Sequence, residues 1–140
     1  NVCGMKNANS NEFKQTDQNV IDMMIEQKQV KDYGGTMRLG AFACKLAKET
    51  KAYKAYKREL IHERHRHRYE VNNSFLEPLK KNGMMVSGVC PQNNLVEIVE
   101  LENHPWFVGV QFHPELKSRA ANAHPLFREF VKAAVGYNKE

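Results

Sequence analysis

Residues 106–112, WFVGVQF, form a nearly continuous apolar run that is stopped by Pro114. Seven residues are far fewer than the roughly 20 needed to span a membrane, and the valines and aromatic side chains favour a strand. Such a run is typical of a strand buried on both faces of a sheet. The sequence therefore predicts a mixed α/β fold, in which His113 and Glu115 follow the carboxyl end of this strand, where α/β folds tend to place functional groups.

The rest of the chain divides into further short elements. Residues 84–89 and 95–101 alternate as strands, joined by the turn residues Pro91, Asn93 and Asn94. Strands are also predicted over 39–46 and within 59–71. Residues 17–30 fit either one helical face or a short buried strand, VIDMMI. Three other segments have looser predictions: little periodicity in 1–13, a mobile glycine-rich loop over 32–41, and an exposed helix or long loop over 49–60.

Two helices have clear boundary signals. Ser74 and Glu77 make a capping box, Leu76 and Leu79 are predicted to face inward, and Gly83 favours a C-terminal stop. Pro78 is compatible with the first turn of this helix. The last helix begins at about Pro125, and its apolar stripe consists of Leu126, Phe127, Phe130, Val131 and Ala134.

Length and composition limit the class of protein. The 140 residues fit one domain, and a content of 41% hydrophobic and 26% charged residues is globular rather than disordered. Three widely spaced cysteines argue against a disulfide framework or a cysteine zinc site and favour a reducing cytoplasm. The chain opens without methionine, so we expect it to be a piece of a longer protein. Its first residues do not have the pattern of a signal peptide, and no run in it is long enough to span a membrane.

His113 and Glu115 are the first candidates for chemistry. A carboxylate beside an imidazole can fix its tautomer and stabilise the imidazolium, which is the orienting half of a nucleophile–base–acid triad. The two side chains can meet only if the chain turns between them, and Pro114 favours that turn. A solvated loop that carries the pair by chance is the alternative, because a three-residue pattern is common.

The pair belongs to a longer set of strings. VGVQFHPE (108–115) resembles the His/Glu motif of class I glutamine amidotransferases. Four stretches resemble the amidotransferase domain of the CTP synthase family in order and spacing, and residues 124–134 resemble its closing helix. The four are NANSNEF (7–13), GGTMRLGA (34–41), ERHRHRYEVN (63–72) and NHPWFVGVQFHPE (103–115). The resemblance implies a flavodoxin-like, three-layer α/β fold that is incomplete, because residues 1–140 would be the C-terminal portion of the domain.

The resemblance implies a role for four residues in glutamine hydrolysis. His113 would be the base of a Cys-His-Glu triad, and Glu115 would orient it. Glu12 would bind the α-amino group of L-glutamine, and Arg68 would bind its α-carboxylate. Opposite charges at the two ends of a zwitterion make physical sense, and a guanidinium fork suits a carboxylate. Without the resemblance, an exposed loop acid and a surface ion pair are the simpler interpretations of Glu12 and Arg68.

Further roles are implied for the glycine-rich segment and for the whole enzyme. Thr36 and Arg38 would belong to a lid that closes when the activator GTP binds, whereas a plain glycine turn is the alternative. No metal and no cofactor are expected on this segment. The whole enzyme is expected to use ATP and Mg²⁺ to convert UTP to CTP in a synthase domain, and to be a cytoplasmic homotetramer.

The nucleophile is the main departure from the family pattern. The family places its cysteine in a G-x-C-x-G-x-Q elbow, and no such string occurs in these 140 residues. Cys3, Cys44 and Cys90 lack that context and are interpreted as ordinary small residues. The elbow, the oxyanion loop and the synthase domain are therefore expected upstream of Asn1, and the isolated chain is expected to be inactive. A catalytically dead domain with a regulatory or assembly role is the alternative.

Two other function classes have some basis in the sequence. His65 and His67 would share a strand face near His62, which suggests a metal site, but the intervening arginines would repel a cation. The net charge of +5 permits contact with nucleic acid. However, only residues 64–68, RHRHR, form a dense basic cluster, and no stacking platform accompanies it, so binding to nucleic acid is not expected.

Overall fold

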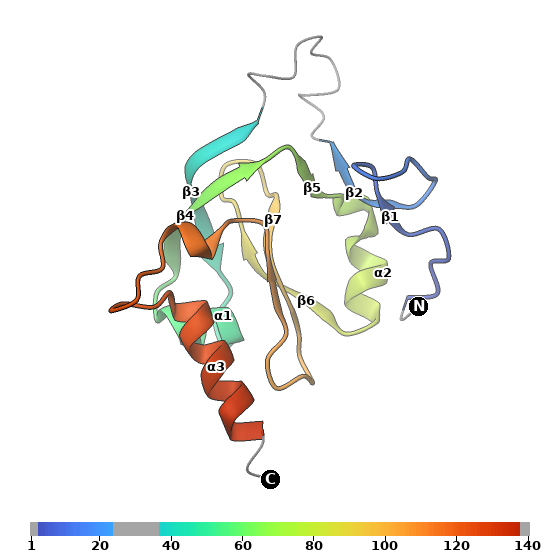
Figure 1. Cartoon of the computed structure of the whole chain (residues 1–140). Helices are drawn as coiled ribbons and strands as arrows, with labels where there is room; N and C mark the ends of the chain where they lie inside the picture. Colours follow the sequence, from blue (N-terminus) through green and yellow to red (C-terminus); the bar gives the residue numbers. More distant parts are fainter. Residues whose placement is uncertain (1–2, 24–36, 138–140) are drawn as a thin grey trace.

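The computed structural model describes residues 3–23 and 37–137, and its largest element is a five-stranded antiparallel sheet (Figure 1). Its strand order is β4-β3-β6-β7-β8. The bounds are β3 Arg38–Leu46, β4 Leu60–His67, β6 Met84–Val89, β7 Val96–Leu101 and β8 Val108–Val110. The strands predicted over 39–46, within 59–71, over 84–89 and over 95–101 are confirmed.

A second, three-stranded sheet lies beside the first (Figure 1), in the order β1-β2-β5. Its strands are β1 Asn9–Ser10, β2 Asn19–Met23 and β5 Tyr69–Val71. Strand β2 resolves the ambiguity of residues 17–30 in favour of a strand over 19–23, and residues 24–30 lie outside the described part. The chain passes from β4 of the large sheet to β5 of the small one through Arg68 alone, so this residue sits where the two sheets meet.

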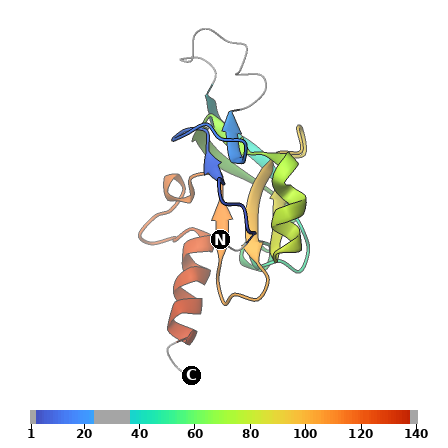
Figure 2. The same ribbon diagram turned by 90° about the vertical axis from the view of Figure 1, so that its right-hand side faces the viewer.

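Within residues 3–23 and 37–137, three helices flank the large sheet. They are α1 Lys51–Tyr56, α2 Leu76–Lys81 and α3 Pro125–Tyr137. Helices α2 and α3 lie on opposite sides of it in both views (Figures 1 and 2), which gives helices on either side of a central sheet. Two single-turn 3₁₀ helices, η3 Asn73–Phe75 and η4 Pro114–Leu116, connect longer elements.

The start of α2 differs from the predicted capping box. Ser74 lies within η3, where its N–H donates to the side chain of Asn72, which caps that turn. Helix α2 itself begins after Phe75 without a side-chain cap. The prediction was wrong because Asn72 competes for the same backbone donor two residues earlier. The predicted end is confirmed, since Gly83 follows the helix with a left-handed φ of 88°.

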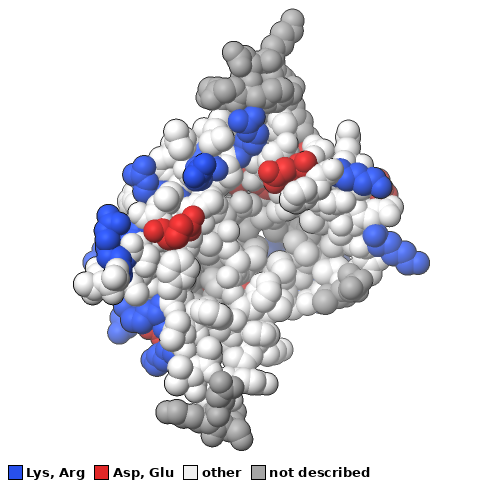
Figure 3. All heavy atoms as spheres, in the orientation of Figure 1, with Lys and Arg blue, Asp and Glu red and all other residues white. Residues whose placement is uncertain are grey.

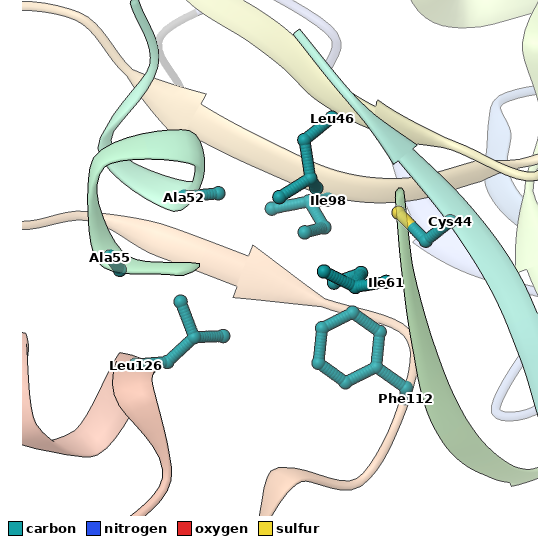
Figure 4. Packing of buried hydrophobic residues seen from close by; sticks show 8 residues of the cluster. All are labelled: Cys44, Leu46, Ala52, Ala55, Ile61, Ile98, Phe112 and Leu126. Atoms are coloured by element: carbon teal, nitrogen blue, oxygen red, sulfur yellow. The ribbon is translucent and has the colours of Figure 1, made fainter. Parts of the chain in front are cut away.

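The core lies between the large sheet and helices α1 and α3 (Figure 4). Ile98 from β7 is fully buried at its centre, and Phe112 reaches it from the segment after β8. Thr50 caps α1 by accepting from Tyr53 N, and Glu100 accepts from two further N–H groups of its first turn. The cluster consists of Cys44, Leu46, Ala52, Ala55, Ile61, Ile98, Phe112 and Leu126.

Strand β8 corrects the interpretation of the apolar run. Only Val108–Val110 forms a strand; all three residues are half-buried, and within the described residues β8 pairs with β7 alone. The predicted burial on both faces is therefore not found within the described residues. Trp106, Val108 and Val110 pack against the core from the sheet edge, so one face of the run accounts for its apolar character.

Helix α3 forms as predicted, but most of its apolar stripe is not covered by the described residues. Leu126 is 5% exposed, whereas Phe130 and Val131 are 53% and 57% exposed. None of the described helices is long and apolar enough to cross a membrane. On the face drawn in Figure 3, Lys and Arg lie mainly along the edges, separated by uncharged and acidic side chains rather than joined into one patch.

Gly88 in β6 supplies a test of the packing. A Cβ atom at this position would lie 2.7 Å from both Cys44 Sγ and Ile98 Cγ1. We therefore expect Gly88→Ala to lower the free energy of unfolding by about 1–3 kcal/mol through overpacking. Calorimetry of the full-length protein that contains this chain would measure it. Gly136→Ala is the matched control, since its Cβ would meet nothing within 4 Å in α3, and a comparable loss there would contradict the explanation.

Candidate functional site

His113 and Glu115 form a hydrogen-bonded pair immediately after β8. His113 Nδ1 lies 2.6 Å from Glu115 Oε1, and the turn η4 that begins at Pro114 brings the two side chains together. The hydrogen bond from His113 lowers the pKa of the Glu115 carboxyl, so the carboxylate stays charged and accepts. The Nδ1 proton is then fixed toward Glu115, and Nε2 is left as the basic nitrogen of the ring.

The pair stands at a cleft of about 510 Å³ between the two sheets. His113 lines this cleft together with Glu12 and Arg68, although Glu12 and His113 are 101 positions apart in sequence. Glu115 is not among the lining residues and reaches the cleft only through His113. The lining consists of Ser10, Glu12, Phe13, Ile21, Met37, Arg66, His67, Arg68, Tyr69, Gln111 and His113.

Glu12 is held on a tight turn after β1. Asn11 N donates to Ile21 O at 2.9 Å, Glu12 N to the hydroxyl of Ser10, and Phe13 N to Ser10 O. The exposed carboxylate of Glu12 therefore projects from a turn that is anchored to β2. The half-buried Arg68 stands on the strand junction across the cleft. A carboxylate and a guanidinium on one cleft can bind an amino group and a carboxylate of the same ligand.

Arg38, which the resemblance assigns to a lid, is buried and paired with two carboxylates. It is 5% exposed, and its guanidinium bonds Glu70 Oε1 at 3.1 Å and Glu97 Oε1 at 2.5 Å. Burial alone would lower the pKa of Arg38, but the two carboxylates raise it, so the side chain stays charged. These contacts occupy the guanidinium, and the assignment of Arg38 to a lid stays a prediction. Thr36, the other predicted lid residue, lies outside the described residues.

None of the three cysteines lines the cleft. Cys44 and Cys90 are buried, and burial raises the pKa of the Cys44 thiol to about 12, which leaves almost no thiolate at neutral pH. Cys3 is half-buried in a turn before β1. Their interpretation as structural residues agrees with these surroundings.

The alternative metal site finds no support in the described part of the chain. His62 is exposed, whereas His65 is buried on the other face of β4. The rings of His65 and His67 are 5.1 Å apart between centroids, but within the described ranges no group of three or more His, Cys, Asp or Glu side chains is arranged to hold an ion.

Several cleft residues were missed by sequence reasoning, although two of them lie close in sequence to predicted site residues. Arg66 lies two positions before Arg68, and Gln111 two positions before His113, and both line the cleft. Glu97 does not line the cleft, but the sequence indicated that it needs a partner, because a carboxylate inside the apolar strand VEIVEL must be paired when it is buried. That partner is Arg38.

The model of the family "Glutamine amidotransferase class-I" matches residues 7–133. The chain belongs to this family. The predicted fold is confirmed with it, because a solved member shares the same architecture. The glutaminase domain of CTPS from Trypanosoma brucei, solved with bound acivicin, superposes with a TM-score of 0.88 at 36% identity, and the match covers 97% of this chain and 53% of that one.

Curated relatives of this amidotransferase chain point to the same family. It is 60% identical over 138 residues to a protein named CTP synthase from Symbiobacterium thermophilum, and 59% identical to another from Chlorobium phaeobacteroides. These matches cover 98% of this chain but 26% and 24% of the relatives, so the chain spans about a quarter of their length. The resemblance to the CTP synthase amidotransferase domain is confirmed.

A more distant solved structure supports the fold alone. This protein from Thermoplasma acidophilum, named for GMP synthase, superposes over 74% of this chain with a TM-score of 0.56 at 15% identity. The match covers 47% of that protein. The amidotransferase architecture therefore extends to a protein of very different sequence.

Proposed function

We propose that this chain supplies part of the glutaminase site of a CTP synthase. The observation that carries the proposal is the 2.6 Å bond between His113 and Glu115 at a cleft that Glu12 and Arg68 also line. Glu12 would bind the α-amino group of glutamine and Arg68 its α-carboxylate, which leaves the side-chain amide to face His113. The names of the relatives support the glutaminase domain of a CTP synthase, whereas the roles of Glu12 and Arg68 rest on the cleft and on the resemblance.

The chemistry follows from the Nδ1 bond. His113 Nε2 takes the proton of a cysteine thiol, and the thiolate attacks the amide carbon of glutamine. When the carbon–nitrogen bond breaks, the imidazolium returns the proton to nitrogen and ammonia leaves. Water then hydrolyses the γ-glutamyl thioester to glutamate, which restores the thiol. Glu115 stabilises the imidazolium throughout. The nucleophile is proposed to come from a part of the protein outside this chain.

The whole protein is proposed to use the ammonia in a synthase domain, where ATP and Mg²⁺ activate UTP for conversion to CTP. Activation by GTP is proposed on the family resemblance alone. The buried Arg38 is not assigned to the binding of GTP. A catalytically dead, regulatory domain is the alternative. Glutamine-dependent ammonia release by the full-length protein distinguishes the two, because a dead domain would release none.

Arg68 provides the sharper test. In the full-length protein we expect Arg68→Met to raise KM for glutamine by about 10- to 100-fold, since a hydrogen bond to a charged group contributes about 1.5–3 kcal/mol. CTP formation from added ammonium, which bypasses the glutamine site, should not change. Steady-state kinetics with each nitrogen source measure both effects.

The matched control is Arg58→Met, which removes an exposed arginine near the opposite end of β4. It should leave KM for glutamine within about twofold of the unaltered protein. An Arg68→Met protein with unaltered KM would overturn the assignment of Arg68 to the substrate carboxylate.

A further inference from the structure

Arg38 bridges two buried carboxylates that belong to different strands. Glu70 in β5 is 3% exposed and Glu97 in β7 is fully buried, and one guanidinium bonds both through separate nitrogens. A planar guanidinium can hold two acceptors in fixed directions at once, whereas a lysine ammonium has no such fork. The bridge therefore fixes the position of β5 relative to β7.

Glu70 connects the bridge to one side of the cleft, residues 66–69, called here the arginine wall. Glu70 follows the wall directly, and the carboxylate oxygen that accepts from Arg38 also lies 2.9 Å from His67 Nε2. Arg38 is in addition the strand partner of His67 at the end of the β3–β4 ladder. The backbone that carries Arg68 is thus held on both sides, by His67 and by Glu70.

Glu97 connects the bridge to the other side, residues 111–113, called here the histidine wall. The carbonyl of Glu97 accepts from Gln111 N at 2.9 Å, two residues before His113. The second carboxylate oxygen of Glu97 lies 3.6 Å from His65 Nε2. The His65 ring in turn contacts Phe112 edge-on, with 5.9 Å between the ring centroids. Backbone and side chain of Glu97 therefore both lead to the segment that ends at His113.

We propose that Arg38 is a positioning residue for glutamine hydrolysis, which holds the arginine wall through Glu70 and the histidine wall through Glu97. Arg38 is not among the cleft-lining residues, so it acts through Arg68 and His113 rather than on the substrate. The inference rests on the proposed function. It adds that the two ion pairs of Arg38 have different effects. The Arg38–Glu70 pair governs the binding of glutamine, and the Arg38–Glu97 pair governs the rate of its hydrolysis.

The two ion pairs are tested separately in the full-length protein. Glu70→Ala should raise KM for glutamine by about tenfold or more with kcat within about threefold of the unaltered protein, because a misplaced Arg68 weakens binding. Glu97→Ala should lower kcat by about tenfold or more with KM within about threefold, because a misplaced His113 slows proton transfer. Calorimetry measures the folded fraction of each variant, ammonium-dependent CTP formation shows that the synthase domain is unaffected, and Glu70→Gln, which keeps the acceptor oxygen, should restore most of the affinity.

Glu100→Ala is the matched control, since Glu100 is an equally buried carboxylate of β7 that bonds α1 instead. It should leave KM and kcat per folded enzyme unchanged. If an alanine variant does not fold, the glutamine variant at that position should show the same shift to a smaller degree. If KM and kcat of every Glu70 and Glu97 variant equal those of the unaltered protein, the inference is overturned. If the unaltered protein itself releases no ammonia, the proposed function is overturned instead.

Discussion

Replacing His113 with alanine in the full-length protein is expected to lower glutamine hydrolysis by about 10³- to 10⁶-fold, the range found when the base of a nucleophilic triad is removed. The reason is the bond between Nδ1 and Glu115, which leaves Nε2 as the basic nitrogen beside the cleft. Without the imidazole, the thiol has no group to accept its proton. The leaving nitrogen of glutamine likewise has no group to donate one. Ammonia release from glutamine measures the loss.

Two comparisons show whether the loss is confined to glutamine hydrolysis and to His113. The His113→Ala protein should still form CTP from added ammonium at the unaltered rate. His62→Ala removes an exposed histidine of β4 and should retain glutaminase activity. Retention of more than a tenth of the activity in His113→Ala would exclude His113 as the base of the reaction.

The sequence predicted those parts of the site that depend on local geometry. The sequence His-Pro-Glu holds the imidazole, the carboxylate that orients it and the proline that favours the turn between them. The turn η4 forms there as expected. The association of Glu12 with Arg68 depends instead on pairing between β2 and β5, which brings residues 21–23 beside residues 69–71. No local pattern contains that long-range pairing, so only the family resemblance placed both residues at one ligand.

The surroundings of Arg38 and of β8 differ from the simplest expectation for a common physical reason. A charged side chain just after a glycine pair is expected to face solvent, and an apolar run is expected to lie inside a sheet. Arg38 is buried beside Glu97, which interrupts an apolar strand and requires a cation, and the run of β8 packs on the core from one face within the described residues. Both outcomes depend on partners that are distant in sequence, which a pattern along the chain does not specify.

Arg38→Met is expected to lower the free energy of unfolding by about 3–5 kcal/mol, because it leaves two buried carboxylates without their cation. Burial already raises the pKa of Glu97 despite the attraction of Arg38, and loss of Arg38 raises it further. A carboxyl whose pKa is higher in the folded than in the unfolded protein destabilises the fold at any pH above its unfolded pKa. The loss should therefore be large at about pH 8 and diminish as the pH falls toward 4.5, the ordinary pKa of this group.

Calorimetry of the full-length protein between about pH 5 and pH 8, where the stability of folded proteins tends to be greatest, measures this dependence. Arg128→Met removes a surface arginine that bonds Glu129 at 3.1 Å and should change stability by less than about 1 kcal/mol at any pH. In the double variant Arg38→Met/Glu97→Gln one of the unpaired charges is absent, so part of the stability should return. Two buried carboxylates without a cation must raise the free energy of the folded state. An Arg38→Met protein as stable as the unaltered one would therefore show that the bridge does not stabilise the fold.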